Sequence, residues 1–190
     1  MNIFSKITYN SPVILSFALL STIIFIVDAI FGGLLMPFFS LSPYFDFTSL
    51  GWYFSLFTYT LGHASLGHLF GNISFMLLIG PILEEKYGSK SLIIMMLITA
   101  FLTALLNNIF FSTGIIGASG IVFMMIILVS FTNAKEGEIP LTFVLVMALY
   151  LGKEVFMAFD QDTTSQFAHI LGGLAGAVFG FSPFLRKGMA

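Results

Sequence analysis

The sequence predicts an all-α integral membrane protein with six membrane-spanning helices. Three observations support this class. Of the 190 residues, 58% are hydrophobic and only 8% are charged, with a mean hydropathy of +1.03. A soluble domain averages about 25% charged residues, so this chain lacks the polar side chains to cover its own surface. The apolar residues also fall into runs close to the roughly 20 residues that a helix needs to cross a bilayer.

Six spans are predicted, with one long segment outside them. The first span runs from about Val13 to Phe31. Residues 32–61 follow as an aromatic stretch whose Pro, Gly and Ser residues make it too irregular for one helix. The fourth span is short for a bilayer, so we expect the loop before it to dip into the membrane against protein. The other five spans are predicted at about 66–86, 91–111, 118–131 (the fourth), 141–158 and 166–185.

Positive charges predict the orientation of these spans. Lys153 lies inside the fifth span, where we expect its side chain to extend outward rather than to act in catalysis. With six spans, the other six Lys and Arg residues fall on one side of the membrane: Lys6, Lys86, Lys90, Lys135, Arg186 and Lys187. The positive-inside rule therefore places both termini in the cytoplasm.

Net charge and cysteine content exclude several classes of function. The net charge of −2 argues against nucleic acid as a partner. Because the chain has no cysteine, it has no disulfide, no thiolate metal site and no cysteine nucleophile. Neither observation indicates an oligomeric state.

Polar side chains inside apolar spans are costly, so they mark candidate functional residues. In the second span, His68 and Asn72 are four residues apart and share one helix face, and His63 precedes them near its outer end. They could form a polar cap bonded to a neighbouring helix, or they could donate hydrogen bonds to a reacting group. The span alone leaves both interpretations open. Further polar residues at membrane depth are Glu84, Asn107 and Asn108.

Ser119 opens the fourth span and is the candidate nucleophile. Gly117 and Gly120 remove side chains on both sides of it, which lets a substrate or another backbone approach closely. The start of a helix also offers backbone N–H groups that can stabilise an anion. A serine in a membrane helix is otherwise most often a packing residue, so the nucleophile hypothesis requires a base beside it.

His169 in the sixth span is the candidate base. At about 100° per residue, it shares one helix face with Gly172, Gly176 and Gly180. Such a row of small residues permits very close contact between helices. The row could serve tight packing alone, or it could bring the imidazole beside a serine on a facing helix.

Together these residues predict a Ser–His dyad. Ser119 would be the nucleophile and His169 the general base, while His68 and Asn72 could donate hydrogen bonds to a developing oxyanion. No Asp or Glu lies at an obvious matching depth to orient the imidazole. Phe123, one turn after the serine, could pack on the ring and hold it instead.

The ordered motifs resemble those of the rhomboid family of intramembrane serine proteases. Three of them occur in the family's order: His63-x4-His68-x3-Asn72, Gly117-x-Ser119-Gly120 and Ala168-His169-x2-Gly172-x3-Gly176. The resemblance covers about residues 50–180, and six spans match the basic, bacterial-type core of the family.

The resemblance implies a single rhomboid-like integral membrane domain over residues 1–190. It would be a six-helix bundle with residues 32–61 as a long, half-submerged outer loop between the first two helices. The fifth span and residues 159–165 would form a mobile gate and cap. The expected location is a bacterial cell membrane, with the lipid bilayer as surroundings.

The resemblance also implies an activity, which is hydrolysis of peptide bonds in or near the transmembrane segments of single-span membrane proteins. Ser119 would attack the scissile carbonyl, and His169 would take and return the proton. His68, Asn72 and the Ser119 backbone N–H would hold the oxyanion, and His63 would tie the second span to the outer loop. No metal or cofactor is implied.

Four other functions fit the sequence less well. A proteolytically silent rhomboid-like protein that binds transmembrane segments is the main alternative, although silent members usually lose the Ser or the His. A small transporter or channel would place its polar groups along a pathway, whereas these cluster toward the outer half. A zinc protease needs a His-Glu-x-x-His helix, and an aspartyl protease needs two intramembrane Asp, whereas Asp28 and Asp160 lie near span ends.

Overall fold

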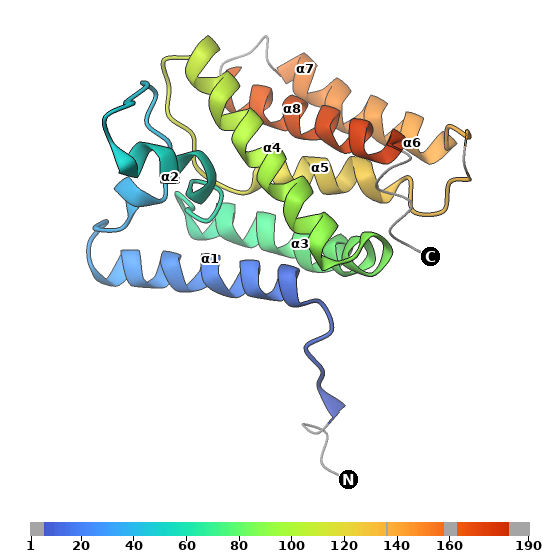
Figure 1. The fold of residues 1–190 in the computed structure, drawn as a ribbon, viewed down its shortest axis with the longest axis horizontal. Coiled ribbons are helices and arrows are strands. Elements are labelled where there is room, and N and C mark those ends of the chain that lie inside the picture. The colour runs from blue at the N-terminus through green and yellow to red at the C-terminus, as the bar shows by residue number, and fades with distance from the viewer. Residues whose placement is uncertain (1–5, 136, 158–162, 183–190) are drawn as a thin grey trace.

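The computed structural model of the chain is a bundle of helices (Figure 1). It describes residues 6–135, 137–157 and 163–182, without the side chains of residues 154, 156, 157 and 163–165. The helices in these ranges are α1 (Pro12–Ile30), η2 (Met36–Phe38), α2 (Leu50–Thr58), α3 (Leu66–Tyr87), α4 (Ser89–Phe110), α5 (Ser119–Val129), α6 (Leu141–Val146), the π-helical η3 (Met147–Leu151), α7 (Gly152–Met157) and α8 (Thr163–Phe181).

Three of the described helices are long and apolar enough to cross a membrane, namely α1, α3 and α4. Shorter apolar helices cover residues 119–129, 141–151 and 166–181. Helices α1, α3, α4 and α5 each begin within two residues of the start that the sequence predicts. Local signals explain this agreement. The Ser65 side chain accepts a hydrogen bond from the His68 N–H and so caps the start of α3.

The structure differs from the prediction in three places. Residues 32–61, expected as one irregular segment, contain the nine-residue helix α2, which is too short to give a spanning signal. The fifth predicted span is not one α-helix, because the π-helical turn η3 interrupts it. The sixth span begins at Thr163, three residues earlier than predicted.

Several predicted features lie outside the described residues. The cations Arg186 and Lys187, the end of the sixth span near Leu185, and Asp160 belong to these positions. The predicted cap at residues 159–165 is described only from residue 163 onward, as the first turn of α8.

Helix α5 lies in the middle of the bundle, between α3 and α8, and α4 crosses these helices (Figure 1). Eight of its eleven residues are buried. A helix that is apolar all round is buried either by other helices or by lipid, and here other helices surround it. Because Ser119 is the first residue of this helix, the candidate nucleophile is presented from the interior of the bundle.

Glycine residues let α8 lie very close to α5. A Cβ added at Gly172 would overlap the backbone of Gly120, and one at Gly176 would lie 3.1 Å from Ile127 Cβ. The close helix contact that the row of small residues predicts is therefore present. It also brings the segment before Gly172 to the start of α5, since a Cβ at Gly120 would lie 3.3 Å from the Ala168 carbonyl oxygen.

Gly172→Ala is expected to lower the melting temperature. The added methyl would overlap the Gly120 carbonyl, and such overpacking costs about 1–3 kcal/mol, or roughly 3–10 °C for a chain of this size. Thermal unfolding of the purified protein in detergent measures the effect. Gly152→Ala is the matched control, because its added Cβ meets no atom within 4 Å. Equal melting temperatures for the two variants would contradict the account of this contact.

The outward faces of the long helices carry large apolar side chains. Exposed examples are Leu19, Ile23 and Ile26 on α1, Phe70 and Leu78 on α3, and Ile94 and Leu97 on α4. Soluble monomers rarely expose apolar patches of more than a few hundred Å². This surface is suited to contact with lipid.

Glu84 joins the ends of three helices. Its carboxylate, on α3, accepts hydrogen bonds from the backbone N–H groups of Val13 (3.0 Å) and Ile14 (3.2 Å) and from the Ser89 hydroxyl (2.6 Å). The two N–H groups belong to the first turn of α1, where the helix supplies no acceptor for them. Glu84 is only 5% exposed, so it is a buried anchor between α1, α3 and α4.

The loop that leads to Ser119 is joined to residues 32–61 by backbone hydrogen bonds. The Leu41 N–H donates to the Ile115 carbonyl (2.9 Å), and the Gly117 N–H donates to the Tyr59 carbonyl (2.9 Å). Two asparagines at the end of α4 bind carbonyl groups of the same region: Asn107 Nδ2 donates to Thr113 (2.8 Å) and Asn108 Nδ2 to Ser42 (2.9 Å). These bonds hold the start of α5 in place.

Candidate active site

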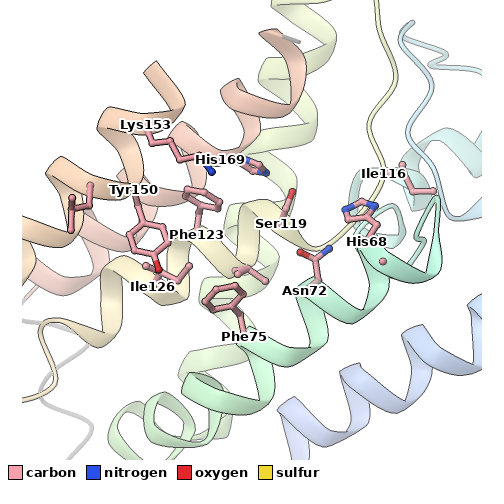
Figure 2. Close-up of a pocket in the computed structure, with 14 residues that line it drawn as sticks. His68, Asn72, Phe75, Ile116, Ser119, Phe123, Ile126, Tyr150, Lys153 and His169 are labelled. Atoms are coloured by element: carbon pink, nitrogen blue, oxygen red, sulfur yellow. The ribbon is translucent and has the colours of Figure 1, made fainter. Parts of the chain in front are cut away.

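A cavity of about 690 Å³ lies between α3, α5, the η3–α7 segment and α8. His68, Asn72, Ser119 and His169 all line it (Figure 2). The sequence predicts these four as the reacting residues, and the fold brings them together from three separate helices. Most of the remaining wall is apolar: Phe75, Ile116, Val122, Phe123, Ile126 and Leu149.

The turn before Ser119 requires glycine. Gly117 has a φ of +112°, which side chains other than that of glycine rarely allow. A Cβ added there would lie 2.6 Å from His68 Nε2 and 3.5 Å from Asn72 Nδ2. The absent side chain therefore lets both candidate oxyanion donors pack against the turn that presents the serine.

The candidate nucleophile and base face each other. Figure 2 shows the Ser119 hydroxyl pointing toward the imidazole of His169. The ring of Phe123 stacks on that imidazole, with 4.2 Å between the ring centres and 5° between the planes. Tyr150 in turn meets Phe123 edge to face at 6.1 Å. The stacking that the sequence suggests for Phe123 is therefore present, and it restricts the tilt of the His169 ring.

His63 determines the orientation of Asn72. His63 is 1% exposed, and its Nδ1–H donates to the Leu61 carbonyl (3.2 Å). This leaves Nε2 as an acceptor, and it accepts a hydrogen bond from Asn72 Nδ2 at 3.0 Å. The amide nitrogen of Asn72 is therefore held in one position, with its second N–H left over for another partner. His63 also ties the loop before α3 to that helix.

Stability is expected to fall in acid because of His63. Burial, with a smaller contribution from the neighbouring imidazole of His68, lowers the pKa of His63 to about 4. In the unfolded chain the imidazole takes up its proton near pH 6.5. The unfolded state therefore binds more protons between these values, so the stabilising contribution of neutral His63 is complete above about pH 6.5 and is lost as the pH falls toward 4.

Thermal unfolding at about pH 7 and about pH 5 tests this pH dependence. The His63→Asn variant is expected to melt below the wild type at the higher pH, because Asn72 loses its acceptor. It is also expected to lose less stability on acidification than the wild type. The same loss in both proteins would contradict the role assigned to His63.

The structure refines the prediction for Lys153. Its side chain is exposed, as the sequence favours, and it also lines the cavity together with His169 (Figure 2). The physical reason is the π-helical turn η3 that comes before it. Such a turn adds a residue to the helical repeat, so the residues that follow turn to a different face. Sequence reasoning also missed Tyr150, which belongs to the π-helical turn itself and lines the same cavity.

The chemical groups available in the cavity are few. Among the described residues that line it, Lys153 carries the only formal charge, and none is an Asp or Glu. In the described part of the chain, no group of three or more His, Asp or Glu residues could hold a metal ion. Among the described lining residues, two hydroxyls (Ser119 and Tyr150), two imidazoles, one amide and one ammonium group remain for chemistry. This set is suited to acyl transfer through the serine.

A family model for the Rhomboid domain matches residues 50–186 of the chain. The chain belongs to the rhomboid family. The match covers most of the chain, from the start of α2 onward, and it includes every residue of the candidate site. Rhomboid membership and the apolar helices together make this an integral membrane protein.

Two curated rhomboid relatives come from Arabidopsis thaliana. RHOMBOID-like protein 1 is 29% identical over 139 residues, which are 69% of this chain and 34% of the relative. RHOMBOID-like protein 4 is 30% identical over 132 residues, which are 65% of this chain and 32% of the relative. The rhomboid chain described above therefore spans about a third of the length of these relatives.

Proposed function

We propose that this rhomboid chain is an intramembrane serine endopeptidase that hydrolyses peptide bonds in or near the transmembrane segments of single-span membrane proteins. The observation that carries the proposal is the meeting of Ser119 and His169 in one cavity, with the hydroxyl directed at the imidazole (Figure 2). Family membership supports it, because rhomboid proteins are generally serine proteases.

The first step is attack by the serine. Ser119 Oγ bonds to the scissile carbonyl carbon while His169 takes the hydroxyl proton as general base. The carbonyl oxygen becomes an oxyanion in the tetrahedral intermediate. The backbone N–H of Ser119 at the start of α5, Asn72 Nδ2 and the His68 imidazole are the donors for this charge, and their position around the Gly117 turn supports that role.

The intermediate then collapses to an acyl-enzyme. The carbon–nitrogen bond breaks, and His169 gives its proton to the leaving amine, which departs as the new N-terminus of one product. A water molecule next attacks the ester carbonyl, with His169 again accepting a proton. Breakdown of the second tetrahedral intermediate returns that proton to Ser119 and releases the other product as a carboxylate. Phe123 holds the imidazole in place during both halves of the reaction, formation of the acyl-enzyme and its hydrolysis.

The proposal includes an arrangement in the bilayer. The six spans are α1, α3, α4, α5, the α6–η3–α7 segment and α8, and residues 32–61 form the half-submerged outer loop. Both termini face the cytoplasm of a bacterial cell, because the cations outside the fifth span then lie on that side. The short α5 and its preceding loop lie inside the surrounding helices, which agrees with the rule that irregular backbone at membrane depth needs protein around it.

The position of the cut tests this proposal against the silent alternative. The full chain is placed in lipid nanodiscs with tagged single-span proteins, and the product masses are measured. We expect products whose new ends lie within or beside the transmembrane segment. A proteolytically silent rhomboid-like protein would bind the segments and leave their masses unchanged, and that outcome would overturn the proposal.

A further inference from the structure

Among the described residues that line the cavity, Lys153 is the one charged residue, and the proposed reaction does not use it. Its side chain is exposed, and it lines the same space as Ser119 and His169. In Figure 2 its amine extends toward the end of the cavity where His169 lies. Tyr150, which lines the same cavity, contacts the Phe123 ring that stacks on the imidazole. Lys153 therefore belongs to the wall next to the reacting groups.

The cation has no acidic neighbour in the described cavity. None of the described residues that line it is an Asp or Glu. Two described carboxylates are engaged elsewhere: Glu84 binds the start of α1, and Asp28 accepts from the backbone N–H groups of residues 35 and 36. A charge at membrane depth is costly without a partner, and its attraction to an opposite charge grows as water is excluded.

We propose that Lys153 determines substrate specificity, with its ammonium group binding an Asp or Glu side chain of the substrate close to the scissile bond. This inference rests on the proposed function and names a substrate class for the same site. When the substrate enters, its carboxylate replaces water around the amine and forms an ion pair with it, a partner that none of the described lining residues supplies.

The position of Lys153 limits where the acidic residue lies in the substrate. An extended chain rises about 3.3 Å per residue, so a cavity of about 690 Å³ holds only a short stretch of it. Because Lys153 and His169 share this cavity, the substrate carboxylate lies within a few residues of the bond that is cut. The phosphate of an anionic lipid would be the other source of negative charge. The substrate is favoured because the amine lies on the wall of the reaction cavity.

The experiment compares substrates that differ in one charge. The cut is first mapped in a neutral single-span substrate, using the full chain in zwitterionic nanodiscs. Asp, Asn or Lys is then placed in turn at each nearby position. We expect at least one position where the wild type cleaves the Asp substrate with about five- to tenfold higher kcat/KM than the Asn substrate, and the Lys substrate more slowly than either.

Variants at Lys153 show whether this preference comes from the ammonium group. Lys153→Met is expected to bring the Asp/Asn ratio to about one, Lys153→Arg to keep the preference, and Lys153→Glu to reverse it in favour of the Lys substrate. Lys90→Met is the matched control, since Lys90 is an exposed lysine on α4 outside this cavity. It should keep the wild-type ratio.

Three results would overturn the inference. The first is an Asp/Asn ratio of one in the wild type at every position, and the second is an unchanged ratio in Lys153→Met. The third is a rate that depends on anionic lipid through Lys153 but not on substrate charge, which would assign the amine to a lipid headgroup. Failure of the proposed function is recognised separately, because the neutral substrate would then show no cleavage that depends on Ser119.

Discussion

Replacing Ser119 or His169 with alanine is expected to reduce cleavage of a transmembrane substrate by at least about 10³-fold in each case. Ser119→Ala removes the oxygen that forms the acyl bond, and no other hydroxyl lines the described cavity apart from that of Tyr150. His169→Ala removes the base and leaves the serine protonated and weak as a nucleophile. Initial rates with a fluorescent single-span substrate in detergent measure both losses.

The double variant sharpens this prediction. Because the two residues act as one unit, the double replacement is expected to be no slower than the slower single variant. Ser130→Ala is the matched control, since the Ser130 hydroxyl at the end of α5 bonds to the Ile127 carbonyl and not to the cavity. Losses that multiply in the double variant, or substantial cleavage by Ser119→Ala, would contradict the dyad.

Replacing Glu84 with alanine is expected to cause the largest loss of stability among these variants. It leaves the N–H groups of Val13 and Ile14 and the hydroxyl of Ser89 without their acceptor. Each buried polar group left unsatisfied costs about 1–3 kcal/mol, so a total of about 2–5 kcal/mol is expected after partial rehydration. This corresponds to a melting temperature lower by roughly 5–15 °C, measured in detergent.

The neighbouring Glu85 provides the control. It carries the same charge at the next position of α3 but is exposed, so Glu85→Ala is expected to change the melting temperature by no more than about 1–2 °C. Glu84→Gln should fall between the two, because the amide keeps one acceptor oxygen. If Glu84→Ala and Glu85→Ala have the same melting temperature, the hydrogen bonds of Glu84 do not hold α1 in place.

The sequence predicts much of this site because the informative residues are local. A polar residue in an apolar span stands out, and helical periodicity places His68 with Asn72 and His169 with its row of glycines on single faces. The short fourth span indicates that the loop before it dips into the membrane against protein. These sequence patterns depend only on regular helix geometry, and the folded helices keep that geometry.

Other features of the fold depend on contacts or local irregularities that regular helix geometry does not reveal. The link from His63 to Asn72 forms only when the loop before α3 folds back on that helix. The place of Lys153 on the cavity wall is not predicted, because the snorkelling argument does not foresee the π-helical turn η3 that comes before it. Helix α2 is not predicted, because a nine-residue helix is too short to be recognised as a membrane span. The link from His63 to Asn72 is tertiary, whereas the π-helical turn and the short helix are departures from the long, regular helix that a membrane span predicts.

Covalent labelling tests the central claim most directly. A fluorophosphonate reacts with serine hydroxyl groups that an adjacent base has activated. We expect one labelled peptide in the wild-type chain, with the added mass on Ser119, and none in His169→Ala. An unlabelled wild type whose melting temperature shows it to be folded, or a label on any other serine, would contradict the assignment of Ser119 as the nucleophile.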